Sequence, residues 1–160
     1  MKVVVAVDSF KGSMTSMEAG MAVKAGVLAA HKDAEVIVKP LADGGEGTTD
    51  ALIEGLNGER VDVTVTGPYH EPVNAYYGYL KDTNTAVMEM ASAAGITISE
   101  QKDPMIATTY GVGEMIADAM ERGIRNFIIG IGGSATNDGG IGMLQALGYG
   151  FLDKEGKQAP

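Results

Sequence analysis

The chain has 160 residues, of which 45% are hydrophobic and 21% charged, so it can form one ordinary globular domain and is too apolar for intrinsic disorder. Twelve Lys and Arg against 21 Asp and Glu give a net charge of −9, which argues against nucleic acid and anionic membranes as partners. The absence of cysteine excludes disulfides, thiolate metal sites and cysteine nucleophiles. The apolar runs are too short for a signal peptide or a membrane span, so we expect a cytoplasmic protein.

The first sixty residues alternate twice between a strand and a helix. The β-branched run over 3–7 predicts a strand buried on both faces of a parallel sheet. Thr15 and Glu18 form a capping-box pattern, which predicts the start of a helix. A second strand over 35–39 and a helix over 48–56 repeat the order. This alternation predicts an α/β fold.

The middle of the chain interrupts that alternation. Residues 60–65 alternate with period two, and a turn with two prolines separates them from the tyrosine-rich run 73–80, which together predict an antiparallel hairpin. A further strand is expected over 85–90. An amphipathic helix over 111–123 and a buried strand over 126–131 then resume the α/β pattern.

We therefore predict a mainly parallel, Rossmann-like sheet flanked by helices, with the hairpin as an excursion towards a second lobe. The end of the chain resembles a strand followed by a charged turn around Gly156, so we expect an architecture that is incomplete in this chain. The predicted division is an α/β lobe over 1–60 and 84–150, a hairpin over 61–83, and an unfinished strand and turn over 151–160.

Three polar loops follow predicted strands, over residues 8–13, 41–48 and 130–140. Ligands of open parallel sheets bind beyond the carboxyl ends of the strands, where such loops converge. The third loop, GIGGSATNDGG, can form an anion nest of backbone N–H groups, to which Ser134 and Thr136 add hydroxyls and the following helix adds its positive end. Each loop taken singly also has an ordinary explanation as a turn or a cap.

Charged residues in these loops each allow two interpretations. A bare Asp138 carboxylate about 4 Å from a phosphate charge would be repelled by about 4 kcal/mol, which outweighs the roughly 0.3–1 kcal/mol from a helix end. Asp138 therefore either caps a helix or holds a cation that the phosphate shares. Lys11 is either solvated or balances an anion, and Asp43 is either a turn residue or a general base or cation ligand. His31 and His70 lack the neighbours of a triad or a zinc site.

Neither of two known phosphate-binding sequence patterns, the P-loop and the dinucleotide fingerprint, fits these loops in full. The P-loop is absent, because the Gly-Lys pair at 156–157 lacks a glycine at the required spacing. Gly130, Gly132 and Ala135 fit G-x-G-x-x-A, and Asp153 lies roughly twenty residues on, as in a dinucleotide-binding fold. The expected helix starts too late for that fingerprint. An NAD(P)-dependent oxidoreductase of a small hydroxy acid stays as the alternative function.

The strings VAVDSFKGSMTS, PLADGGEGT, TTYGVGE and GIGGSATNDGG, in this order, resemble the N-terminal part of the bacterial two-domain glycerate kinases, the glycerate 2-kinase family. The resemblance implies two α/β lobes around a cleft, in which ATP and Mg²⁺ phosphorylate D-glycerate, usually to 2-phosphoglycerate. Chains of this family are more than twice as long. Either this chain is a fragment of such a protein, or a homodimer or a second chain completes the cleft. A further alternative is that this chain alone is a non-catalytic lobe of a kinase.

The resemblance also implies roles for particular residues. Catalysis is expected of Lys11 and Asp43, and metal binding of Asp138. The residues expected to bind the cofactor ATP are Gly132, Gly133, Ser134, Thr136 and Asn137. The residues expected to bind the substrate are Asp8, Ser9, Gly44, Gly45 and Glu46.

Overall fold

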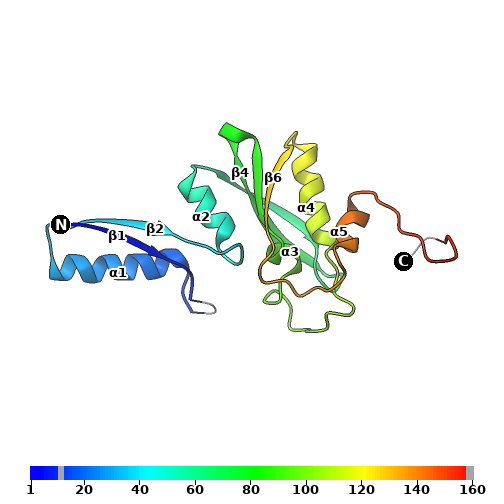
Figure 1. Cartoon of the computed structure of the whole chain (residues 1–160), viewed down its shortest axis with the longest axis horizontal. Coiled ribbons are helices and arrows are strands. Elements are labelled where there is room, and N and C mark those ends of the chain that lie inside the picture. Colours follow the sequence, from blue (N-terminus) through cyan, green and yellow to red (C-terminus); the bar gives the residue numbers. More distant parts are fainter. Residues whose placement is uncertain (11–12, 158–160) are drawn as a thin grey trace.

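The computed structural model describes residues 1–10 and 13–157 and contains two separate sheets (Figure 1). The first is a parallel pair, and the second has four strands in the order β3-β4-β5-β6. The strands are β1 Lys2–Val7, β2 Glu35–Pro40, β3 Glu59–Thr66, β4 Pro72–Leu80, β5 Thr85–Glu89 and β6 Asn126–Gly130. The helices are α1 Ser16–Ala30, α2 Thr48–Gly55, α3 Ala91–Ala94, α4 Tyr110–Glu121 and α5 Ile141–Ala146, with a short 3₁₀ helix at Lys81–Thr83.

The first sheet is covered by one helix. The predicted capping box of α1 is confirmed: the Thr15 hydroxyl accepts from the Glu18 N–H at 3.2 Å, and the Glu18 carboxylate accepts from the Thr15 N–H at 2.8 Å. The prediction that β1 is buried on both faces is wrong within the described residues. Val5 is 5% exposed, but its neighbour Val4 is 60% exposed, because α1 packs on one face of the pair.

The second sheet confirms the α/β class and contains less parallel pairing than predicted. β3 pairs antiparallel with β4, β4 antiparallel with β5, and β5 parallel with β6. The connections over 67–71 and 81–84 are too short for the crossover that a parallel pair needs. The predicted hairpin thus shares a sheet with β5 and β6, whereas β1 and β2 pair apart from it. The division into domains stays a prediction.

Helices cover both faces of the second sheet. The Tyr77 hydroxyl on β4 donates to Asp118 of α4 at 2.7 Å, whereas a side chain at the next residue, Gly78, would contact Ile53 of α2. Successive residues of a strand point to opposite faces, so α2 and α4 lie on opposite sides. The core on the α4 side includes Tyr77, Met88 and Met115, all fully buried.

The end of the described chain forms the predicted turn. The Gly156 N–H donates to the Asp153 carbonyl at 3.0 Å, and Gly156 has a φ of +79°. Within the described residues no strand lies between α5 and this turn, so the strand predicted just before it is absent there. Among the helices of residues 1–10 and 13–157, none has both the length and the apolar character that crossing a membrane requires.

Gly113 of α4 allows close packing against α5, and this leads to a first prediction. A Cβ on Gly113 would lie 2.3 Å from the Met143 carbonyl oxygen of α5, whereas a Cβ on Gly26 of α1 would meet no atom within 4 Å. We expect Gly113→Ala to lower the free energy of unfolding by about 1–3 kcal/mol. Gly26→Ala, the matched control, should raise it by roughly 0.5–1 kcal/mol, because alanine favours a helix. Urea denaturation measures both, and equal effects would contradict this packing.

Candidate functional site

Two of the three polar loops touch through their backbones. The Gly132 N–H donates to the Gly44 carbonyl oxygen at 3.0 Å. A Cβ on Gly130 would lie 2.5 Å from that same oxygen, and a Cβ on Gly132 would lie 2.7 Å from the Gly45 Cα. These positions therefore exclude any side chain. The expectation that loops 41–48 and 130–140 converge is confirmed.

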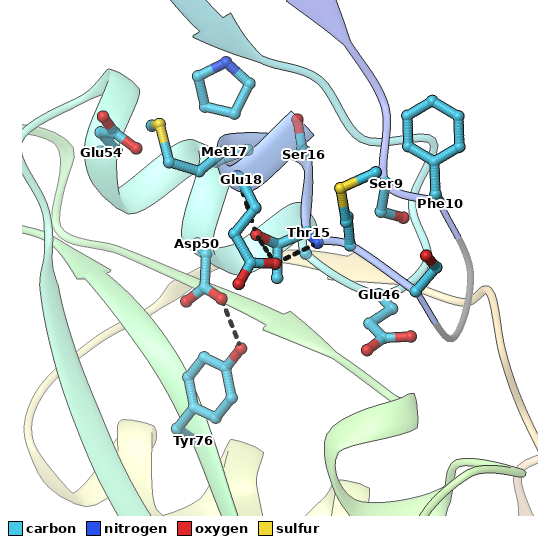
Figure 2. A pocket seen from close by; sticks show the side chains of 15 residues that line it. Ser9, Phe10, Thr15, Ser16, Met17, Glu18, Glu46, Asp50, Glu54 and Tyr76 are labelled. Atoms are coloured by element: carbon cyan, nitrogen blue, oxygen red, sulfur yellow. Dashed lines mark hydrogen bonds between the residues drawn. The ribbon is translucent and has the colours of Figure 1, made fainter. Parts of the chain in front are cut away.

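The first loop meets loop 41–48 across a pocket of about 410 Å³ (Figure 2). Ser9 and Phe10 line it from the end of β1, and Glu46 and Gly47 line it from the start of α2. Figure 2 also shows Asp50 and Tyr76 in the pocket wall; the Tyr76 hydroxyl donates to the Asp50 carboxylate at 3.1 Å. Burial is the main cause of the raised pKa of Tyr76, and the nearby Asp50 charge adds to it.

The pocket is acidic. Its carboxylates come from Glu18, Glu46, Asp50 and Glu54, and no Lys or Arg of residues 1–10 and 13–157 lines it. Glu18 is occupied by its capping box. Lys11, the cation that the sequence places in this region, lies outside the described residues. An anion in the pocket would need compensating cations or N–H donors.

The glycine-rich loop pairs through its backbone with residues 94–96. The Ile96 N–H donates to the Gly133 carbonyl and the Ala135 N–H to the Ala94 carbonyl, both at 2.9 Å. Gly133 has a φ of +73°, which disfavours other residues. Within the described part of the chain, the N–H groups of Gly133 and Ser134 have no acceptor. Such a run of N–H groups around a left-handed residue can bind an anion.

Two hydroxyls and an amide flank this run. The Ser134 and Thr136 hydroxyl oxygens lie 2.8 Å apart, and the Ser134 oxygen accepts from the Thr136 N–H at 3.0 Å. Asn137 is exposed. The five residues predicted to bind ATP thus lie on one continuous loop, but none of them lines the acidic pocket. Their role in binding stays a prediction.

Asp138 points into the protein and caps two helices. Its carboxylate accepts four hydrogen bonds: from the Thr109 N–H at 2.8 Å, the Thr109 hydroxyl at 2.7 Å, the Gly140 N–H at 3.0 Å and the Gly142 N–H at 3.2 Å. Burial disfavours the charge, but these bonds outweigh it and lower the pKa of Asp138. The geometry matches the capping alternative and offers no support for the predicted metal role.

The hydrogen bonds of Asp138 also revise the expectation that the positive end of α5 helps the loop to bind an anion. Asp138 uses the N–H groups of Gly140 and Gly142 through its side chain, and its carbonyl accepts from the Ile141 N–H at 3.2 Å. The first N–H groups of α5 are therefore occupied. An anion at this loop would bind to the N–H groups around Gly133, because the positive end of α5 is already used.

Two further predicted residues, Asp43 and Asp8, each accept a hydrogen bond from a nearby backbone N–H. Asp43 accepts from the Gly45 N–H at 3.0 Å, which matches its alternative interpretation as a turn residue, and Asp8 accepts from the Ser9 N–H at 2.7 Å. Both carboxylates are on exposed residues. No group of three His, Cys, Asp or Glu residues suited to a metal occurs within the described ranges.

Sequence reasoning missed two residues that support the site. Glu89, at the end of β5, is 6% exposed and accepts from the Thr49 N–H of α2 at 2.7 Å. Thr109 joins Asp138 to α5, because its hydroxyl also accepts from the Met143 N–H at 2.9 Å. The available signal for Glu89 was a single carboxylate in an otherwise buried strand.

The capping role of Asp138 gives a second prediction. Asp138→Asn should lower the free energy of unfolding by about 1–3 kcal/mol, since an amide cannot replace four charge-assisted bonds. The pKa of Asp138 is lowered from its usual 3.8, so its stabilisation is complete above that value and is lost as pH falls through the folded-state pKa. The difference between wild type and variant should therefore shrink between about pH 5 and pH 2 in urea titrations.

Asp103→Asn is the matched control. The Asp103 carboxylate accepts a single backbone bond, from the Met105 N–H at 3.0 Å, on an exposed loop. Its substitution should change stability by no more than about 0.5 kcal/mol. A loss of that small size for Asp138→Asn, or a loss that does not depend on pH, would contradict the double cap.

Comparison with known proteins places these loops in a family. The sequence model described as "Glycerate kinase family" matches residues 3–160. The chain is 46% identical over 160 residues to "Glycerate kinase" of Bacillus subtilis (strain 168) and, also over 160 residues, 46% identical to "Glycerate 2-kinase" of Escherichia coli (strain K12). Each alignment covers 99% of this chain and 42% of the relative.

The fold agrees with these alignments. A crystal structure from Salmonella typhimurium LT2 matches with a TM-score of 0.82 and 46% sequence identity, over 99% of this chain and 43% of that one. The chain thus spans less than half the length of the relatives that it matches. The family match extends over nearly all of its own residues, including the three polar loops. The chain belongs to the glycerate kinase family.

Proposed function

We propose that the complete protein is a glycerate kinase, which transfers the terminal phosphoryl group of ATP to D-glycerate and forms 2-phosphoglycerate. The observation that carries the proposal is the backbone contact between the loops of Gly44 and Gly132, in a chain whose family match spans both loops. The name of the Escherichia coli relative, glycerate 2-kinase, supports the choice of the 2-hydroxyl.

Phosphoryl transfer needs little covalent chemistry from the protein; it needs positioned groups and compensated charge. In the proposed site, the N–H groups of Gly133 and Ser134 bind phosphate oxygens, with Thr136 and Asn137 beside them. Gly132 keeps this loop against Gly44. The binding energy comes from donors that are already fixed by the pairing with residues 94–96, so little order is lost when ATP binds.

The other predicted residues serve the acceptor. Asp43 takes the proton of the glycerate hydroxyl as the oxygen bonds to phosphorus and the bond to ADP breaks. Lys11 balances the charge of the phosphoryl group or of the glycerate carboxylate. Glycerate lies near Ser9 and Glu46, with Asp8, Gly44 and Gly45 as the other predicted contacts.

Mg²⁺ is proposed to bind at the Glu46 carboxylate, which leaves the Asp43 carboxylate free to act as the base. Magnesium ions are usually held by one or two carboxylates together with substrate phosphates, so a cluster of three acidic residues is not required. Glu46 is exposed on loop 41–48, as such a site needs. When bound, Mg²⁺ neutralises charge on the phosphates. Asp138 is a poorer candidate, because its oxygens already accept four hydrogen bonds.

The remaining expectations belong to the same proposal. We propose a cytoplasmic enzyme with a small-molecule substrate, and a cleft completed by a homodimer or a second chain. No observation favours the NAD(P)-dependent oxidoreductase, since α5 begins at Ile141, well after the Ala135 that would end the dinucleotide fingerprint. The chain by itself is expected to lack glycerate kinase activity unless the rest of the cleft is supplied.

The third prediction tests the catalytic residues in the complete protein. With glycerate and MgATP, Asp43→Asn should lower kcat by about 10²–10⁴, as removal of a general base does. Lys11→Ala should also lower kcat strongly, because a charge developing in the transition state loses its partner. Coupled measurement of ADP release gives both values.

Two surface substitutions serve as controls. Lys32→Ala and Asp33→Asn change the same residue types on the exposed turn after α1. Both controls should keep kcat close to that of the wild type. Near-normal kcat in Asp43→Asn and Lys11→Ala would overturn the roles assigned here, whereas a wild-type protein inactive on glycerate would overturn the proposed function itself.

A further inference from the structure

We propose that Glu89 is a positioning residue for phosphoryl transfer: its buried carboxylate anchors the first turn of α2 and so holds loop 41–48 against the glycine-rich loop. The inference rests on the proposed function. Glu89 touches neither predicted substrate nor predicted cofactor residues through its side chain, so its effect on the reaction would be indirect.

The start of α2 needs a cap from elsewhere. Gly47, its N-cap residue, has a φ of +91° and no side chain, so the usual Ser, Thr, Asp or Asn cap is missing. The first N–H groups of any helix lack partners within the helix. The Glu89 carboxylate supplies one from another element, by accepting from the Thr49 N–H at 2.7 Å. Glycine at 47 allows the loop to turn, and Glu89 replaces the cap that this glycine cannot provide.

Glu89 also lies beside the glycine-rich loop. All five residues of β5 are buried, and Glu89 pairs with Gly130, the last residue of β6. The next residue, Met90, donates its N–H to the Gly130 carbonyl at 2.9 Å. Thus the backbone around Glu89 fixes where loop 130–140 leaves the sheet, while its side chain fixes where loop 41–48 enters α2.

Burial of the Glu89 carboxylate costs free energy of folding. Burial raises the pKa of Glu89, against the hydrogen bond from the Thr49 N–H, and the nearby Asp50 carboxylate raises it further. A buried carboxylate stabilises a fold less well than an apolar side chain of similar size would, even when it accepts a backbone N–H as Glu89 does from Thr49. What the carboxylate adds is a fixed position for the start of α2, and therefore for Asp43 to Gly47. Misplacement of reacting groups by about 1 Å can cost roughly a hundredfold in rate.

The test compares Glu89 with a second carboxylate that holds a backbone N–H away from the loops. Glu114 of α4 accepts from the Thr66 N–H of β3 at 2.6 Å and takes no part in the proposed site. Kinetics with glycerate and MgATP, and thermal unfolding, are measured for Glu89→Ala, Glu89→Gln and Glu114→Ala in the complete protein. Hydrogen exchange of peptides covering 41–49 and 60–66 is followed in parallel.

We expect Glu89→Ala to lower kcat roughly ten- to a hundredfold and to speed exchange in 41–49. Glu89→Gln should recover most of the rate, since its amide oxygen still accepts from the Thr49 N–H. Glu114→Ala should lower the melting temperature and speed exchange in 60–66, with kcat close to wild type. A Glu89→Ala protein with normal kcat, or an equal loss of kcat in Glu114→Ala, would overturn the inference.

The two proposals can fail separately. A wild-type protein that does not phosphorylate glycerate refutes the proposed function, and the exchange data then decide the anchoring role. Unchanged exchange of 41–49 in Glu89→Ala would show that the carboxylate does not hold the loop. Active wild type with unaffected Glu89 variants would refute the positioning role alone.

Discussion

The hydrogen bond from the Gly132 N–H to the Gly44 carbonyl, 3.0 Å long, joins two loops that enter from different sheets and helices. It requires glycine on the 130–140 side of the contact, since a Cβ at Gly130 or Gly132 would overlap loop 41–48. The distance between the predicted phosphate-binding N–H groups and the predicted acceptor residues is therefore set by backbone contact. Two of the three loops of the proposed kinase site are held together by it.

Carboxylates that accept backbone N–H groups reduce the conflict between the net charge of −9 and the proposed phosphate site. Glu18, Glu89 and Asp138 each accept backbone N–H groups at the start of a helix, so their charge is used inside the fold. Hydrogen bonds to the ionised form compensate the local field of such groups. The Gly133 and Ser134 N–H groups, which have no acceptor within the described chain, are the donors that the proposal assigns to phosphate.

Local signals predicted much of this from the sequence. The capping box at Thr15, the hairpin and the late helix start after Gly140 all depend on residues close together in the chain, and the structure contains all three. The order of the strands in the sheet could not be predicted, because no residue near the hairpin in the sequence indicates that it pairs with β5. Glu89 was missed for the same reason: its partner Thr49 is distant in sequence. The estimated repulsion between Asp138 and a phosphate left two roles for Asp138, a helix cap or a cation ligand. The four donors that favour the cap come from residues that only the folded structure brings together.

The position of the nucleotide phosphates tests the account most directly. A crystal structure of the complete protein with Mg²⁺, glycerate and a non-hydrolysable ATP analogue would measure it. The account predicts phosphate oxygens within hydrogen-bonding distance of the Gly133 and Ser134 N–H groups, with the terminal phosphate facing Asp43. Phosphates bound elsewhere, with the loop around Gly133 unoccupied, would contradict the central claim that the joined glycine loops form the phosphate site.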